Sequence, residues 1–124
     1  MPQVLIVEDD WPTTQLFQML LKRGGFEVSI AHNAQEALAM LDNGTKIPDA
    51  IILDVMLPGM LGIALCKILR ERQIAVPILM MSASQDEESK REGLAAGANE
   101  YLTKPLLQHD LVETIRRYLT AAPL

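Results

Sequence analysis

The stretch that decides the fold is Ala50-Ile51-Ile52-Leu53-Asp54, an unbroken apolar run that ends at a carboxylate. A short run without polar residues is typical of a strand in the middle of a parallel sheet, because helices cover both of its faces. Leu57-Pro58-Gly59 breaks the chain soon afterwards. Asp54 is therefore expected at the carboxyl edge of the sheet, where open α/β sheets bind their ligands.

Outward from this stretch, strand-like and helix-like segments alternate along the chain. Short apolar runs at 4–7, 27–31, 78–81 and 100–102 predict the other strands. Helices are predicted from Pro12 to Gly24-Gly25, from Asn33 to Asn43-Gly44, over 63–72 and 86–96, and finally to about residue 119. Five β-α units of this kind predict a parallel sheet with helices on both faces.

Local signals fix several details of these helices. Apolar residues at helical spacing predict the inner face of the first helix: Leu16, Phe17, Leu20 and Leu21. Asn33, with Glu36 three residues later, predicts a capping-box-like start for the second helix. In the charged helix at 86–96, apolar surface is expected mainly from Leu94 and the alanines. Leu107 offers no side-chain cap, so a weakly capped last helix is expected.

Length and composition indicate one cytoplasmic domain over 1–124, with a tail or linker starting at about 120. The chain is 49% hydrophobic, enough to bury a core. The lone Cys66 excludes an internal disulfide and fits a reducing compartment. No signal peptide is visible, and no apolar run approaches the roughly 20 residues of a membrane helix.

The charge and the aromatic content argue against contact between this domain and nucleic acid. The net charge is −5 and the pI is about 4.9, so phosphate backbones would be repelled. Aromatic residues make up only 4% of the chain, which is little for a base-stacking platform.

Polar residues gather where the predicted strands end. Glu8, Asp9 and Asp10 follow the first strand, and the others follow later strands: Asp54, Ser82 and Lys104. Clustered carboxylates favour a bound cation, and hard oxygen ligands suit Mg²⁺. A carboxylate can itself accept a phosphoryl group. Read singly, each acid could instead be a loop residue or a helix cap.

Four segments in this order make the chain resemble the receiver (CheY-like) domain of bacterial two-component response regulators over essentially its whole length. The segments are 5–10, 53–59 with Gly62, 81–83 and 97–105. The resemblance implies a flavodoxin-like (βα)5 three-layer sandwich with strand order 2-1-3-4-5. It also implies Mg²⁺, which Mn²⁺ can replace.

The resemblance implies roles residue by residue. Asp54 would be the phospho-acceptor, and Lys104 and Ser82 would contact the phosphoryl group. The metal ligands would be Asp9, Asp54, the backbone carbonyl of Met56 and, mainly through water, Glu8. Ser82 and Tyr101 would form the switch pair that changes the surface of the helix at 86–96, the strand at 100–102 and the last helix. The Lys104-Pro105 bond would be cis.

The implied partners are a histidine kinase or histidine phosphotransfer protein and a downstream output domain or protein. A homodimer through the switch surface stays an open alternative. Its charge pattern is incomplete: Lys90, Glu100 and Arg116 or Arg117 offer part of it, but Thr114 stands where a basic residue is common.

The chain departs from the family pattern in places. Leu61 stands where Asp is frequent before Gly62, in a loop where it should face outward. The positions linked to dephosphorylation rate are Met56 and Ser84, and neither offers a carboxylate or amide to orient an attacking water. The sequence therefore predicts a long-lived phosphoryl group.

Two other functions compete with the receiver. A pseudo-receiver would bind partners without phosphate, but the polar residues at the strand ends are retained. A magnesium-dependent phosphohydrolase would need a general acid two residues after its nucleophile, where Met56 or Trp11 stands. No enzymatic turnover is therefore expected beyond self-phosphorylation from a phosphodonor and slow self-dephosphorylation.

Overall fold

The computed structural model describes residues 2–42, 47–83, 86–104 and 108–120. Strands and helices alternate in these ranges: β1 (Gln3–Val7), α1 (Trp11–Arg23), β2 (Glu27–Ala31), α2 (Ala34–Asp42), β3 (Ala50–Asp54), α3 (Gly62–Glu71), β4 (Ile78–Ser82), α4 (Glu87–Ala95), β5 (Glu100–Thr103) and α5 (Gln108–Thr120). The strands are parallel and lie in the order β2-β1-β3-β4-β5. The predicted α/β sandwich with strand order 2-1-3-4-5 is confirmed.

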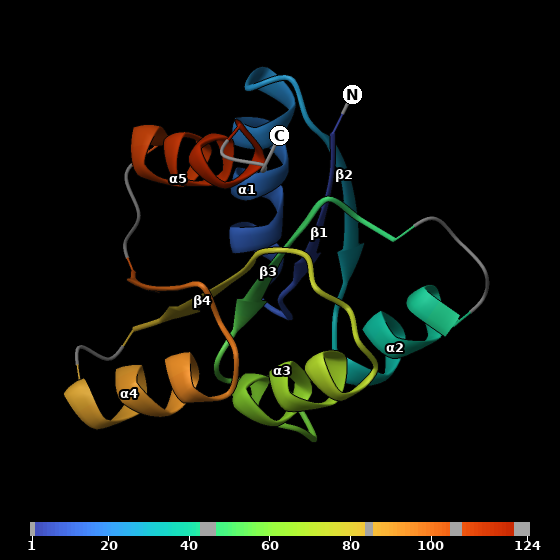
Figure 1. Cartoon of the computed structure of the whole chain (residues 1–124). Coiled ribbons are helices and arrows are strands. Elements are labelled where there is room, and N and C mark those ends of the chain that lie inside the picture. Colours follow the sequence, from blue (N-terminus) through green and yellow to red (C-terminus); the bar gives the residue numbers. More distant parts are fainter. Residues whose placement is uncertain (1, 43–46, 84–85, 105–107, 121–124) are drawn as a thin grey trace.

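The core lies on both faces of the central strand β3, whose residues are all buried. Ile51 and Leu53 belong to a cluster that includes residues of α2 and α3, whereas Ile52 belongs to a second cluster with α1 and α5. Figure 1 shows the resulting layers, with α1 and α5 on one side of the sheet and α2, α3 and α4 on the other. This double coverage explains why the run at 50–53 has no polar residue.

Helix ends follow the local signals in the sequence. Asp10 is the N-cap of α1 and accepts a hydrogen bond from the Thr13 amide at 3.1 Å. The other end of α1 closes with Gly25 at φ +93°, which favours glycine. At the start of α2, the Glu36 amide donates to Asn33 Oδ1 at 2.8 Å, so the predicted capping interaction is confirmed.

One side chain expected on the inner face of α1 is exposed. Leu16 is 45% exposed, because the buried stripe of α1 is centred between Phe17, Leu20 and Leu21 and leaves Leu16 at its edge. Leu94 of α4 is 41% exposed, and α4 instead turns Gly93 toward the sheet. The prediction for Leu16 was wrong because apolar spacing alone does not show where the edge of the buried stripe lies.

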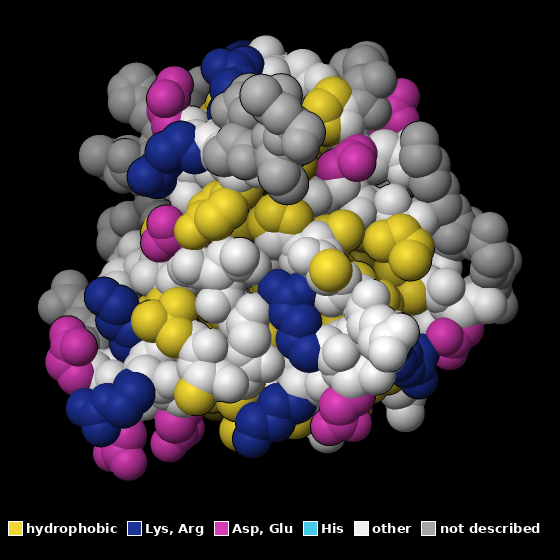
Figure 2. Space-filling model, viewed as in Figure 1, with side chains coloured by type: hydrophobic (Ala, Val, Ile, Leu, Met, Phe, Trp, Pro, Cys, Tyr) yellow, Lys and Arg dark blue, Asp and Glu magenta, His cyan; other side chains and the backbone are white. Residues whose placement is uncertain are grey.

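The surface carries mixed charge on the side that Figure 2 shows. Lys, Arg, Asp and Glu side chains are interspersed over α3 and α4 there, without a block of one sign. Among the described residues, no helix combines the length and apolar character needed to cross a membrane. The predicted weak cap at Leu107 lies outside the described residues. The tail was predicted from about residue 120, but α5 continues to Thr120, and the residues after it lie outside the described ranges.

Candidate functional site

Three acids meet at the carboxyl edge of the sheet. Glu8 and Asp9 follow β1, and Asp54 ends the adjacent strand β3, so parallel pairing brings their ends together. One carboxylate oxygen of each lies within 4.8 Å of those of the other two. Glu8 is fully buried, Asp54 is nearly so and Asp9 is exposed, which leaves the cluster open on one side. An all-oxygen donor set with an open side fits Mg²⁺ and its water ligands.

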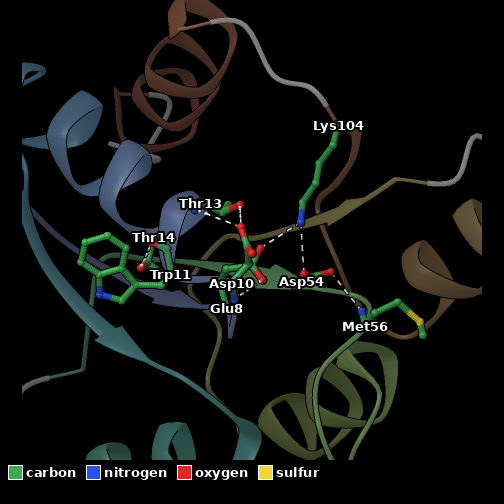
Figure 3. Close-up of polar contacts among 8 residues, drawn as sticks. All are labelled: Glu8, Asp10, Trp11, Thr13, Thr14, Asp54, Met56 and Lys104. Atoms are coloured by element: carbon green, nitrogen blue, oxygen red, sulfur yellow. Dashed lines mark hydrogen bonds and ion pairs between the residues drawn. The ribbon is translucent and has the colours of Figure 1, made fainter.

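Lys104 enters this cluster from the end of β5. Its Nζ donates to Glu8 Oε1 at 2.9 Å and to Asp54 Oδ2 at 3.1 Å. Figure 3 shows the ammonium between the two carboxylates, reached by an extended side chain. The Lys104 amide donates to the Ser82 carbonyl at 2.8 Å, which holds the residue beside β4. The lysine thus supplies the positive charge that clustered acids require.

Burial and neighbouring charged groups shift the pKa values of Glu8 and Lys104. Burial and the hydrogen bond with Asp54 raise the pKa of Glu8 to about 7, although Lys104 and the Asp10 amide act in the opposite direction. Burial disfavours the charged form of Lys104, but its bonds to Glu8 and Asp54 outweigh burial and raise the pKa of Lys104. Glu8 therefore carries a proton more readily than an exposed carboxyl does.

We expect this shift to make stability depend on pH. In the folded chain the pKa of Glu8 is about 7, whereas a carboxyl with the ordinary value, as in the unfolded chain, has a pKa of 4.5. The folded chain therefore binds this proton more tightly than the unfolded chain does. The free energy of unfolding should therefore fall as pH rises through this window, by on the order of 3 kcal/mol from this group. Urea titrations in EDTA between pH 5 and 8 measure the slope. Glu8→Gln should flatten it, and an equal slope in the variant would contradict the assignment.

Asp10 lies beside the cluster but does a different task. Its carboxylate caps α1 by accepting from both the amide and the hydroxyl of Thr13, and these bonds lower the pKa of Asp10. Trp11 begins α1, and in Figure 3 its indole points away from the carboxylates. Of the three consecutive acids, Glu8 and Asp9 thus belong to the cluster, while Asp10 holds the helix.

The loop after β3 holds Asp54 in place. The Met56 amide donates to Asp54 Oδ1 at 3.0 Å, and the Met56 side chain is 67% exposed and points away from the carboxylate in Figure 3. Leu61 is exposed as expected. The other position linked to dephosphorylation rate, Ser84, lies outside the described residues, as does Pro105.

Gly62 has a structural role in the site that the sequence did not predict, since Gly62 was recognised there only as part of a motif. It begins α3, and its amide donates to the Val55 carbonyl at 2.8 Å. A Cβ at this position would lie 2.2 Å from the Asp54 carbonyl oxygen, far inside van der Waals contact. The helix can start this close to Asp54 only because residue 62 is glycine.

The two residues predicted as a switch pair lie on adjacent strands. Ser82 ends β4 and is 5% exposed, next to the acidic cluster in the strand register. Tyr101 of β5 is 8% exposed and pairs with Met80. The ring of Tyr101 belongs to the buried cluster beneath α3 and α4.

Comparisons with known proteins agree with this architecture. The family model described as "Response regulator receiver domain" matches residues 4–116. The chain is 38% identical to the alkaline phosphatase synthesis transcriptional regulatory protein PhoP of Bacillus subtilis, with 94% of this chain and 48% of that protein covered. It is 40% identical to the sensory transduction protein RegX3 of Mycobacterium tuberculosis, with 96% and 51% covered.

A solved structure shows the same fold. The Francisella response regulator 1452 receiver domain has a TM-score of 0.90 and 33% identity, with 97% of this chain and 98% of that chain covered. The chain spans about half the length of the curated relatives it matches. With the family matched over residues 4–116 and its fold reproduced, the chain belongs to the response regulator receiver domains of two-component systems.

Proposed function

We propose that Asp54 accepts a phosphoryl group from a histidine kinase or a histidine phosphotransfer protein. The observation that carries the proposal is the convergence of Lys104, Glu8, Asp9 and Asp54 from three strands onto one point. An Asp54 carboxylate oxygen would form a bond to phosphorus while the bond from phosphorus to the donor nitrogen breaks. Buried partners and a nearby lysine fit a transfer that depends on positioning and charge neutralisation.

Each residue of the cluster has a distinct part in this proposal. Asp9, Asp54, the Met56 carbonyl and, through water, Glu8 would hold Mg²⁺, or Mn²⁺ in its place. The bound cation would neutralise charge on the phosphoryl oxygens. Lys104 is already paired with Asp54 and would turn its Nζ to a phosphoryl oxygen. Ser82 would donate its hydroxyl to another.

The phosphoryl group would act on the surface of α4, β5 and α5 through Ser82 and Tyr101. It would bias an equilibrium between two arrangements of these side chains. The relative PhoP is named a transcriptional regulatory protein and is about twice as long as the matched region. We infer that residues 1–124 form one receiver domain, that it acts in the cytoplasm, and that it controls a transcriptional output.

The same surface offers little support for a charged homodimer. Thr114 is buried, Glu100 accepts a hydrogen bond from the Tyr118 hydroxyl at 3.1 Å, and Arg116 donates to the Gly24 carbonyl at 2.7 Å. Two of the charges that such a dimer would use are thus already bonded within the chain. The homodimer through α4, β5 and α5 stays a prediction without further support.

Acetyl phosphate and Mg²⁺, followed by intact-mass measurement, test the proposed function. We expect a stable gain of one phosphoryl group that disappears in Asp54→Asn and in EDTA. Asp42→Asn, at an exposed acid on α2, is the matched control and should gain the group like the parent chain. No gain would support a pseudo-receiver instead, and continuous release of phosphate would support a phosphohydrolase.

The proposed phosphoryl group should persist for minutes or longer. Met56 presents an exposed thioether that points away from Asp54 and cannot orient an attacking water. After the donor is removed, intact mass against time gives the lifetime. Met56→Glu should shorten it severalfold, and Met56→Leu should leave it unchanged. A half-life of seconds in the parent chain would contradict this prediction.

A further inference from the structure

Tyr101 packs its ring directly beneath Gly93 of α4. Gly93 is the buried residue of that helix, and a Cβ built there would lie 3.1 Å from Cδ2 of Tyr101. Such an approach is tighter than nearly all side-chain contacts, so the ring would have to give by a few tenths of an ångström. The inward position of Tyr101 thus depends on a missing side chain on the neighbouring helix.

Met80 lies on the other side of this space and has little room to move. Met80 is the cross-strand partner of Tyr101, and its Sδ would lie 2.9 Å from the same Cβ. Met80 is fully buried in the central sheet, among close-packed side chains. Tyr101 lies at the margin of the core and keeps 8% of its surface exposed, so it can turn outward more readily. A methyl group on residue 93 would therefore press on both side chains, and the tyrosine has the more room to move.

A second feature works against the inward ring. The Tyr101 hydroxyl is buried and has no hydrogen-bond partner among the residues that the structure describes. A buried hydroxyl without a partner has a higher free energy than one that is hydrogen-bonded to water, so burying it is unfavourable. The packing of the ring favours the inward position, and the unpaired hydroxyl favours the outward one. The unpaired hydroxyl thus offsets part of the packing free energy that holds the ring inward.

We propose that Gly93 is the positioning residue of the switch, because it leaves the space under α4 that the inward ring of Tyr101 occupies. This inference rests on the proposed function for its meaning in signalling, but the space itself does not depend on phosphate. Gly93→Ala should shift the ratio of inward to outward rings toward outward by at least about fivefold, the lower range for an added methyl group in a packed core.

Fluorine NMR on protein labelled with 3-fluorotyrosine tests the position of the ring. The chain has two tyrosines, and Tyr101→Phe assigns the signals. In the parent chain the Tyr101 signal should show little solvent isotope shift between H₂O and D₂O, and Gly93→Ala should increase it. Glu92→Ala, which adds alanine at the exposed neighbour on α4, should leave it unchanged. A folded Gly93→Ala protein whose Tyr101 signal stays buried would overturn the proposal.

A double-mutant cycle keeps the test decisive if Gly93→Ala folds poorly. In the Tyr101→Val background the ring is gone and the Met80 thioether can move into the freed space, so alanine at 93 should lower the melting temperature less than it does in the parent chain. If Gly93→Ala lowers the melting temperature equally in the parent chain and in the Tyr101→Val background, the proposal is overturned. Neither measurement uses a phosphodonor, so a failed acetyl phosphate reaction would reject the proposed function alone.

Discussion

Replacing Gly62 by alanine is expected to destabilise the folded chain by about 3 kcal/mol and to slow phosphoryl uptake at Asp54 on the order of 100-fold. The new Cβ would lie 2.2 Å from the Asp54 carbonyl oxygen and 3.0 Å from the Val55 Cα. Both atoms belong to the backbone, so no rotamer change relieves the contact. The start of α3 and the acceptor must move apart, and Asp54 then loses its alignment with Lys104.

Gly59→Ala is the matched control in the same loop. Gly59 has φ +78° but nothing within 4 Å of its added Cβ, so alanine there should cost only about 1 kcal/mol of backbone strain. Urea titration gives the two free energies, and the rate of mass gain in acetyl phosphate gives the two reactivities. If Gly59→Ala and Gly62→Ala lose similar amounts of unfolding free energy and of phosphoryl uptake rate, then loop conformation, rather than close contact with Asp54, explains the need for glycine at 62.

Arg70→Ala is expected to lower the free energy of unfolding by about 3 kcal/mol, because it removes several charge-assisted hydrogen bonds at once. The guanidinium donates to the carbonyls of Gly97, Ile74 and Val76 at 2.6–3.0 Å. It also donates to Asn99 Oδ1, which accepts from the Ile78 amide as well. Arg70 thus joins the segments that lead into β4 and β5.

Arg72→Ala serves as the control for Arg70→Ala. Arg72 makes an exposed ion pair with Asp42 at 2.6 Å, and such surface pairs contribute at most about 1 kcal/mol. Arg70→Lys should recover only part of the loss, since an ammonium cannot reach several carbonyls with a planar fork. Phosphoryl uptake should survive in all three variants, because this network lies at the opposite edge of the sheet from Asp54. A loss for Arg70→Ala no larger than for Arg72→Ala would contradict the role given to Arg70.

Several features were predictable because they follow from local rules. The buried strand β3, the capping of α2 by Asn33 and the glycine that ends α1 each depend on a few neighbouring residues. Periodicity was less reliable for Leu16. It marks a stripe on a helix only to within one residue, and packing against the sheet decides which side chain is buried.

Some features of the candidate site were likewise predictable from the sequence, and others depended on the tertiary structure. The sequence by itself determined the alternating pattern, the parallel sheet and the gathering of Glu8, Asp9, Asp54 and Lys104 at one edge, because the direction of each strand places its end there. Only the tertiary structure decided that Asp10 caps a helix instead of joining the acids, that Lys104 lies between two carboxylates, and that Gly62 touches the acceptor. The contacts of Lys104 join residues 96 and 50 positions apart in the chain, and the packing of the strands fixes such distances. The contacts of Asp10 and Gly62 are between near neighbours, but they form only because α1 and α3 begin at these residues in the folded chain.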